Sequence, residues 1–303
     1  MQLSEMNRKV MGKLAEDLLT WIDGENPDVA KFLRNAFNGE KIDPAKLEET
    51  ISFFTANSAI TGCVLASPGS SVISELLYAQ RKTASVIDQY FYNSKGGMAV
   101  KGRLEAMQKY LPPIMERYLQ DKEEVIIGSL GSGPARYIIN AVLQLKTKGY
   151  NGGVKAFCFD IDENAILRGK CNAMIEGVAD VIKYKRSDMQ GNIVGYYRNK
   201  FHVLVLKGIL CPYDSRGCRT LLEHVKIMLK PGGTIIASNV SKKMVEDDPF
   251  TCFIMNNIVN WIMCYKNESE LKEIFEEAGF IWKGSFTDDL GFHIMGIGEV
   301  PLS

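Results

Sequence analysis

Two patterns of hydrophobic positions divide the chain near residue 120. Up to about residue 118, apolar side chains recur every three or four residues, which predicts a series of amphipathic helices. From about residue 121, short apolar runs alternate with helical stretches, which predicts alternating strands and helices. We therefore expect an all-helical region over residues 1–118, followed by an α/β domain over residues 119–303.

The second half of the helical region contains the longest predicted helices. One amphipathic helix is expected over residues 72–91, between the loop 66–71 and a glycine-containing break at 93–97. The last helix covers residues 98–118, with a bend or interruption at Pro112-Pro113, because proline removes a helical hydrogen bond.

The α/β domain is predicted to contain about seven strands. Five apolar runs are expected to be parallel strands, at 125–130, 154–159, 181–184, 201–206 and 234–238. The last two runs, 281–287 and 292–299, are expected to form an antiparallel pair. Helices are expected at 134–147, 163–176, 218–229 and 268–278. This alternation predicts a doubly wound sheet with ligands at the carboxyl ends of its strands.

Composition narrows the range of partners. The 303 residues are 46% hydrophobic and carry 36 basic and 36 acidic side chains, so no basic excess indicates a nucleic-acid partner. No apolar run reaches 18 residues, which argues against a membrane span. Seven scattered cysteines without a Cys-x-x-Cys pair argue against a metal site and fit a reducing, cytoplasmic location. Whether the N-terminal helices form a homo-oligomer or cap the cleft stays open.

A glycine-rich turn follows the first predicted strand. Gly131 and Gly133 allow a ligand to approach the backbone, and Pro134 suits the start of a helix. Arg136 stands where a nicotinamide-type fingerprint has a third Gly or Ala, and no Gly-Lys-Ser/Thr triplet of a P-loop follows. The turn therefore indicates a nucleotide-like ligand without naming it.

Carboxylates follow the second and third strands. Asp160 ends strand 2, where a carboxylate can accept both hydroxyls of a ribose, whereas Asp162 is better suited to capping the next helix. Asp188 ends strand 3, within reach of an adenine amine in such a cleft. The two strand-end carboxylates favour a nucleoside ligand.

In this order, Gly131-Ser-Gly-Pro-Ala135, Phe159-Asp-Ile-Asp162, Asp188 and Leu229-Lys-Pro-Gly-Gly233 resemble the class I S-adenosylmethionine-dependent methyltransferases. The resemblance covers residues 121–303 and implies a Rossmann-like fold with S-adenosylmethionine as cofactor. It implies cofactor contacts from Ser129, Gly131, Ser132, Gly133, Asp160, Ile161, Asp188, Met189 and Gly208.

The resemblance also assigns roles and shows departures. Ser129–Gly133 would line the methionine end, Asp160 would hold the ribose, and Ile161 with Asp188-Met189 would contact adenine. Gly208 would lie where cofactor and acceptor meet. The family commonly has an acid at Ser129, a third glycine at Ala135 and an acid at His202.

Methyl transfer mainly requires alignment of donor and acceptor, and a base only if the acceptor is protonated. Tyr213 and Asp214 are the catalytic candidates, with helix capping as the alternative role for Asp214. Tyr90, Tyr213 and Trp261 are candidate substrate contacts. Asn-Pro-Pro-Tyr is absent after strand 4, which argues against nucleobase amines as acceptors.

The acceptor is expected to be a small molecule. Trp261 and Tyr265-Lys266, in and after the apolar insert 248–265, resemble a segment of bacterial methyltransferases that esterify 3-hydroxy fatty acids. That resemblance implies a carboxylate acceptor, and a hydroxyl acceptor is the other option.

Two alternatives to methyl transfer remain open. Phe159-Asp-Ile-Asp162 also resembles nicotianamine synthase, which transfers the aminobutyryl arm of S-adenosylmethionine. A non-catalytic binding protein is the second alternative. The histidines His202, His224 and His293 show no pairing in the sequence, and we expect them to be structural.

Overall fold

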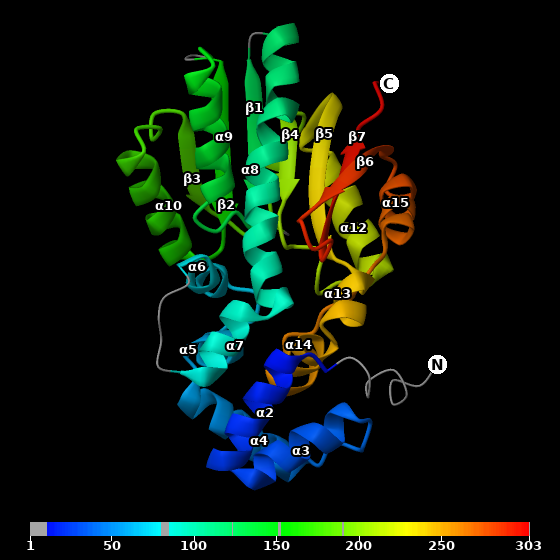
Figure 1. Ribbon diagram of the computed structural model, residues 1–303. Coiled ribbons are helices and arrows are strands. Elements are labelled where there is room, and N and C mark those ends of the chain that lie inside the picture. The colour runs from blue at the N-terminus through cyan, green and yellow to red at the C-terminus, as the bar shows by residue number, and fades with distance from the viewer. Residues whose placement is uncertain (1–10, 80–84, 123, 151–152, 190, 303) are drawn as a thin grey trace. The chain divides into compact units, whose positions relative to one another are not determined.

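The computed structural model describes residues 11–79, 85–122, 124–150, 153–189 and 191–302. The chain forms two compact units, whose elements are labelled in Figure 1. The helical unit comprises Met1–Lys101, Lys242–Met263 and Leu290–Phe292, and the α/β unit comprises Gly102–Ser241, Cys264–Asp289 and His293–Ser303. The functional division expected at residue 118 stays a prediction.

The helical unit is built from short helices. They are α2 (Lys13–Glu25), α3 (Pro27–Phe37), α4 (Pro44–Asn57), α5 (Ala59–Ala66), α6 (Ser71–Ala79), α7 (Val86–Asn93), α13 (Lys242–Asp247), α14 (Pro249–Phe253) and the π-helix η2 (Ile254–Ile258). The prediction of one helix over 72–91 is wrong, because two separate helices, α6 and α7, occupy this stretch. Ser85 accepts the backbone N–H of Asp88 at 3.0 Å and caps α7, so a new helix begins there. Residues 80–84 lie outside the described part.

The apolar insert after the fifth strand belongs to the core of the helical unit. The ring of Phe250 on α14 packs edge-on against Phe37 of α3, with centroids 5.2 Å apart. Both rings are buried with Ile22, Leu33 and other apolar side chains. The insert therefore completes a hydrophobic core that the N-terminal helices share.

Helix α8 (Lys95–Lys122) is not interrupted at Pro112-Pro113. Pro112 has no N–H, so it cannot donate to the carbonyl of Gln108. The side-chain amide of Gln144 on α9 donates to that carbonyl at 2.9 Å instead. The helix thus continues past the prolines, contrary to an interruption. Over the described ranges, no helix combines the length and hydrophobicity that crossing a lipid bilayer requires.

The α/β unit contains a seven-stranded, mostly parallel sheet, as predicted. Its strands are β1 (Val125–Leu130), β2 (Val154–Asp160), β3 (Ile182–Arg186), β4 (Phe201–Leu206), β5 (Leu229–Val240), β6 (Ile281–Thr287) and β7 (His293–Glu299). The order is β3-β2-β1-β4-β5-β7-β6, and β7 is antiparallel to both neighbours. Every residue of β1 and β4 is buried, which explains why both strands are largely apolar.

Strand β5 begins earlier than predicted. Leu229 pairs with Phe201 and Thr234 pairs with Val203, so residues 230–233 form an irregularity within the strand. The backbone groups of Gly232 and Gly233 also bond Val300. Phe201 belongs to the same hydrophobic cluster as Leu204 and Leu206.

Helices cover the sheet of the α/β unit (Figure 1). Besides the later part of α8, they are α9 (Arg136–Thr147), α10 (Glu163–Ile175), α11 (Ile193–Tyr196), α12 (Ser215–Lys226) and α15 (Glu268–Glu277). On α8, the Tyr118 hydroxyl lies 2.8 Å from that of Thr234 on β5, and the ring of Tyr110 lies 4.5 Å from that of Phe286 on β6. These contacts fix the line of α8 across the sheet.

The topology reverses at β1, which pairs with β2 on one side and β4 on the other. In open parallel sheets, connections diverge at such a point and leave a crevice outside the carboxyl ends of the strands. The segments that follow β1, β2, β3 and β4 therefore converge there. These segments contain the predicted cofactor residues.

Candidate active site

The glycine turn after β1 is held in an uncommon backbone conformation. Gly131, Gly133 and Ala135 have φ angles of 57°, 55° and 56°, all in the left-handed region. The N–H of Ser132 donates to the carbonyl of Phe159 at 3.0 Å, which ties the turn to β2. A Cβ added to Gly131 would lie 2.3 Å from Cδ1 of Ile209, so a larger residue would displace this side chain and would also adopt a left-handed φ that favours glycine. Helix α9 begins at Arg136, two residues later than predicted, because the turn continues through Ala135.

The left-handed Ala135 leads to a stability prediction. Ala135 and Ala141 are both buried, so Ala135→Gly and Ala141→Gly each remove a buried methyl group. Only Ala135 has a positive φ, since Ala141 lies inside α9. Ala135→Gly should lower the free energy of unfolding by about 1–2 kcal/mol less than Ala141→Gly does. This difference is the cost of a left-handed alanine, which glycine avoids. Urea denaturation measures both free energies of unfolding, and equal losses would refute the strained turn.

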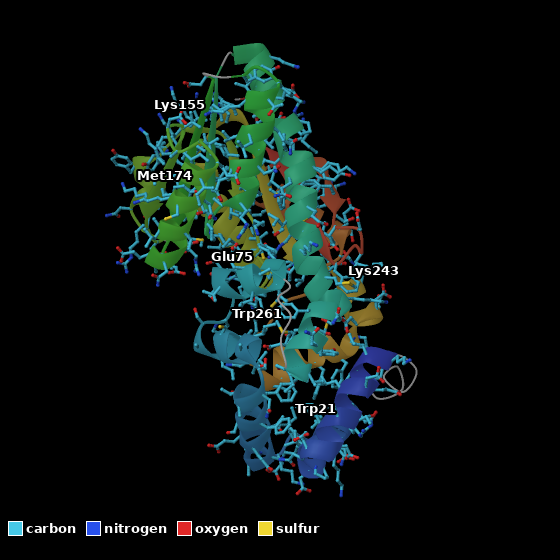
Figure 2. The ribbon with its side chains drawn as sticks, turned by 60° about the vertical axis from the view of Figure 1, so that its left-hand side comes forward. Trp21, Glu75, Lys155, Met174, Lys243 and Trp261 are labelled. Atoms are coloured by element: carbon cyan, nitrogen blue, oxygen red, sulfur yellow. The ribbon has the colours of Figure 1, made fainter. Side chains whose placement is uncertain are left out.

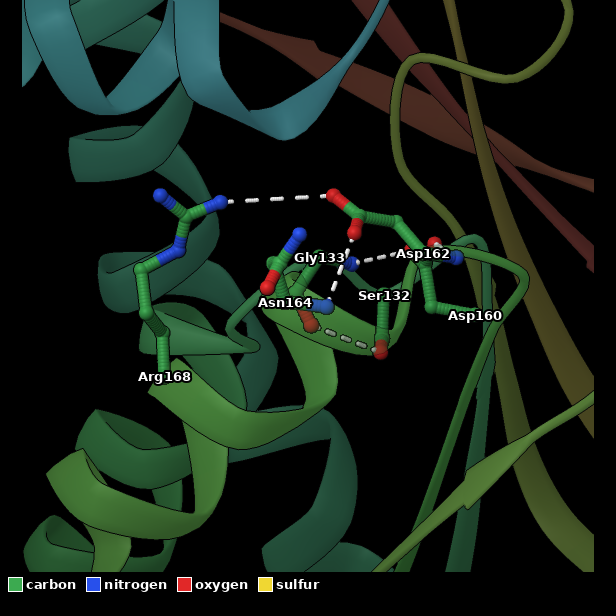
Figure 3. A network of polar contacts seen from close by, with 6 residues as sticks. All are labelled: Ser132, Gly133, Asp160, Asp162, Asn164 and Arg168. Carbon is green, nitrogen blue, oxygen red and sulfur yellow. Dashed lines mark hydrogen bonds and ion pairs between the residues drawn. The ribbon is translucent and has the colours of Figure 1, made fainter.

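Asp160, the last residue of β2, is bonded to the glycine turn (Figure 3). Its Oδ2 accepts the N–H of Gly133 at 2.7 Å, and its Oδ1 accepts the N–H of Asp162 at 2.9 Å. A carboxylate offers about four lone-pair positions, so acceptor capacity remains on both oxygens. Asp160 is thus oriented by two backbone groups and is only partly buried.

Asp162 caps α10, as the sequence suggested. Its Oδ1 accepts the N–H of Asn164 at 2.9 Å, and its Oδ2 lies 4.0 Å from the guanidinium of Arg168 (Figure 3). The two neighbouring carboxylates therefore have different structural roles. Asp160 ties the turn to the strand, and Asp162 begins the helix.

The residues expected around adenine follow β2 and β3. The side chain of Ile161 is 65% exposed, unusual for an isoleucine next to a buried strand. Asp188 is exposed, and the half-buried Met189 points toward the glycine turn, with its Cε 3.6 Å from the position of a Gly131 Cβ. The structure brings Met189 to the turn, and adenine contact by these three residues stays a prediction.

Ser129 does not present its hydroxyl at the surface. The residue is 0% exposed, and its hydroxyl is hydrogen-bonded to that of the buried Tyr137. A ligand could reach the Ser129 side chain only by breaking this bond. The pairing explains how a serine is accommodated where the family commonly has an acid, and it leaves the backbone of Ser129 as its contribution to a ligand.

Hydrogen bonds hold the loop after β4, residues 207–214, in place. The N–H of Gly208 donates to the hydroxyl of Ser238 on β5 at 2.7 Å. Farther along, the carbonyl of Tyr213 accepts from the buried Lys266 at 2.7 Å. Asp214 is exposed and accepts the N–H of Gly217 at 2.7 Å, so it caps α12, which starts three residues before its predicted position. Catalysis by Tyr213 or Asp214 stays a prediction.

Tyr90 and Trp261 belong to the helical unit. Tyr90 is 3% exposed and its hydroxyl lies 2.7 Å from that of Thr251. Burial raises the pKa of Tyr90 well above its ordinary value, so it is no base at neutral pH. Trp261, labelled in Figure 2, is half-buried against the hydrophobic core, with its indole nitrogen close to Gly69. Substrate binding by either side chain stays a prediction.

Arg103 and His293 were not recognised from the sequence as site residues. The guanidinium of Arg103, on α8, lies against Gly208, and the buried His293 begins β7. Burial lowers the pKa of His293 to about 4, helped by the positive charges of Arg103 and Lys207 and opposed by Asp288. A lone arginine on a helix has no sequence signal, because its neighbours depend on how the helix packs.

A family model described as "Putative methyltransferase" matches residues 77–298, which is most of the chain. The chain belongs to this family. A search of curated proteins found no match.

Solved structures of methyltransferases share the fold. The chain is similar to an O-methyltransferase family protein from Burkholderia thailandensis, with 12% identity, 88% of this chain and 74% of that chain covered, and a TM-score of 0.51. It is similar to magnesium protoporphyrin IX methyltransferase from Synechocystis PCC 6803 with bound SAH, with 10% identity, 80% and 99% covered, and a TM-score of 0.53. A possible exported protein from Bordetella parapertussis gives 17% identity, 96% and 100% covered, and a TM-score of 0.64.

The family and the fold together place the chain among the class I S-adenosylmethionine-dependent methyltransferases, whose cofactor is S-adenosylmethionine. The residues present fit this cofactor. Asp160 keeps acceptor capacity for ribose hydroxyls, Ile161 exposes an apolar side chain beside it, and Gly131 leaves no side chain in the turn. Ser129 is the point of difference, since its hydroxyl is already paired.

Proposed function

We propose that this chain transfers the methyl group of S-adenosylmethionine to a small-molecule acceptor. The observation that carries the proposal is the hydrogen bond of 2.7 Å between the N–H of Gly133 and the carboxylate of Asp160. It joins the glycine turn and the strand-end carboxylate into one rigid cradle at the carboxyl ends of β1 and β2. A cradle of this kind suits a ligand with a ribose beside a polar chain.

Each proposed cofactor residue is assigned to one part of S-adenosylmethionine. Asp160 would accept the ribose hydroxyls, Ile161, Asp188 and Met189 would contact adenine, and the turn Ser129–Gly133 would line the methionine end through its backbone. The cofactor supplies an electrophilic methyl group and leaves as a neutral thioether. The protein's part is then to orient the acceptor and exclude water near Gly208.

The acceptor is proposed to react through oxygen, as a carboxylate or a hydroxyl. A carboxylate is ionised at neutral pH and needs no general base. This is consistent with Asp214 acting as a helix cap and Tyr213 contributing its carbonyl to a structural hydrogen bond. The helical unit would select the acceptor, and a cytoplasmic location stays a prediction.

Calorimetry of the full chain is the first test. We expect S-adenosylmethionine and S-adenosylhomocysteine to bind with one site each, since both share the ribose and adenine that Asp160 and its neighbours would hold. Dissociation constants in the micromolar range correspond to about 8 kcal/mol of binding free energy. A folded protein that binds neither molecule would refute both this function and the aminobutyryl alternative.

Product analysis then separates methyl transfer from aminobutyryl transfer. Incubation of the protein with S-adenosylmethionine and a small-molecule extract should yield S-adenosylhomocysteine. Methylthioadenosine as the nucleoside product would instead support the nicotianamine-synthase-like reaction. Tight binding without either product across acceptor extracts would favour a non-catalytic binding protein.

A further inference from the structure

Arg103 is a buried arginine for which the described residues provide no hydrogen-bond or ion-pair partner. The residue is 8% exposed, and its Nε is buried with no hydrogen-bond partner in the part of the chain that the structure describes. No ion pair or hydrogen bond of its guanidinium is found within those residues either. A buried charge is costly unless it is paired, so an unpaired arginine inside a protein indicates a missing anion.

The guanidinium lies beside the segment where the acceptor is proposed to react. A Cβ built on Gly208 would be 2.9 Å from Nη1 and 3.3 Å from Cζ of Arg103. Gly208 has a φ of 78° and is the second residue after β4. The charge of Arg103 also opposes the rise in the pKa of Cys211 that burial causes.

Charged groups of both signs lie near Arg103. Lys207 precedes Gly208, and its Nζ lies 5.2 Å from the ring centroid of Tyr137. His293, whose pKa is lowered to about 4, is neutral at pH 7 and does not compensate the charge. Asp288 is buried nearby, but its Oδ1 accepts the backbone N–H of His293 at 2.5 Å. Its Cβ and Oδ2 lie 3.1 and 3.6 Å from the position of a Cβ on Gly102, the residue before Arg103.

We propose that Arg103 binds a carboxylate in the methyl-transfer site. A guanidinium offers two parallel N–H donors that match the two oxygens of a carboxylate, and burial strengthens such a pair. Two molecules can supply this group: the methionine part of the cofactor, or the acceptor. The placement at the reaction site rests on the proposed function, whereas the need for an anion rests on Arg103 alone.

Two variants and one control test the proposal. Arg103→Gln removes the charge and keeps hydrogen-bonding capacity, and Arg103→Lys keeps the charge without the planar fork. Arg219→Gln is the control, because Arg219 on α12 pairs with Glu277 at the surface. All three should fold, and removal of an unpaired buried charge should not destabilise the ligand-free protein.

The first arm concerns the cofactor. If Arg103 holds the methionine carboxylate, the wild type should bind S-adenosylmethionine at least about tenfold more tightly than decarboxylated S-adenosylmethionine. Arg103→Gln should lose this preference, because its affinity for S-adenosylmethionine should fall while its affinity for the decarboxylated compound stays the same. Arg103→Lys should keep part of the preference, and Arg219→Gln should keep all of it.

The second arm concerns the acceptor. If Arg103 holds the acceptor carboxylate, Arg103→Gln should leave S-adenosylmethionine affinity unchanged. Monocarboxylates from acetate to octanoate, but not the corresponding amides, should then raise the melting temperature of the wild type with and without S-adenosylhomocysteine, and should not do so for Arg103→Gln. The arm without cofactor stays informative even if no cofactor binds.

A folded Arg103→Gln variant that matches the wild type in both arms would overturn the proposal. Loss of binding in Arg219→Gln as well would attribute the effect to net charge and would also overturn it. Failure of the wild type to bind any adenosyl compound, with carboxylates still bound through Arg103, would refute the proposed function alone.

Discussion

Replacing Asp160 with Asn should lower the affinity for S-adenosylmethionine and S-adenosylhomocysteine by about 10- to 100-fold, the value of one or two charge-assisted hydrogen bonds. Both oxygens of Asp160 accept backbone N–H groups, from Gly133 and from Asp162. An amide of the same shape places an NH₂ group against one of these donors, whichever way it turns. The variant therefore weakens the ribose site and loosens the glycine turn together.

Asp162→Asn is the matched control for this experiment. It makes the same chemical change two residues away, and asparagine caps helices as well as aspartate does. Asp162 caps α10 through the N–H of Asn164, so its replacement should leave both dissociation constants within about twofold. Isothermal titration calorimetry at one salt concentration compares the three proteins. If Asp162→Asn weakened binding and Asp160→Asn did not, the ribose would belong to the other carboxylate.

The strands that position the site could be predicted because they are buried on both faces. β1 and β4 are largely apolar, with Ser129 and His202 as their polar residues, and such segments favour a central parallel strand. The different roles of Asp160 and Asp162 also follow from sequence, since one ends a strand and the other precedes a helix. Local geometry decides these features, so local sequence is enough.

Features that depend on tertiary packing could not be predicted. The start of α7, within the stretch 72–91 where one helix was expected, is set by Ser85, which also donates to the distant carbonyl of Asn57. The hydroxyl of Ser129 is paired with Tyr137, which only the packing of α9 on β1 reveals. Arg103 is one polar residue among many on α8. Its position beside Gly208, a residue far away in the sequence, becomes visible only in the folded structure.

The buried His293 should make the protein less stable in mild acid. Its pKa is about 4 in the folded protein and 6.5 in an unfolded chain, because burial and the charges of Arg103 and Lys207 disfavour the protonated ring. Asp288 opposes this effect, although its Oδ1 is 3.5 Å from Nδ1 and forms no hydrogen bond with it. At a pH between these two pKa values, the imidazole binds a proton in the unfolded chain and not in the folded protein.

The free energy of unfolding should therefore fall by about 3 kcal/mol between pH 7 and pH 4 on account of His293, and the loss should level off below pH 4. His293→Gln should lack this part of the decrease, while every carboxylate common to both proteins contributes equally. Urea denaturation across this pH range gives the difference. His224→Gln, a change at an exposed position of α12, should follow the wild type. Parallel curves for the wild type and His293→Gln would mean that the imidazole is solvated in the folded protein.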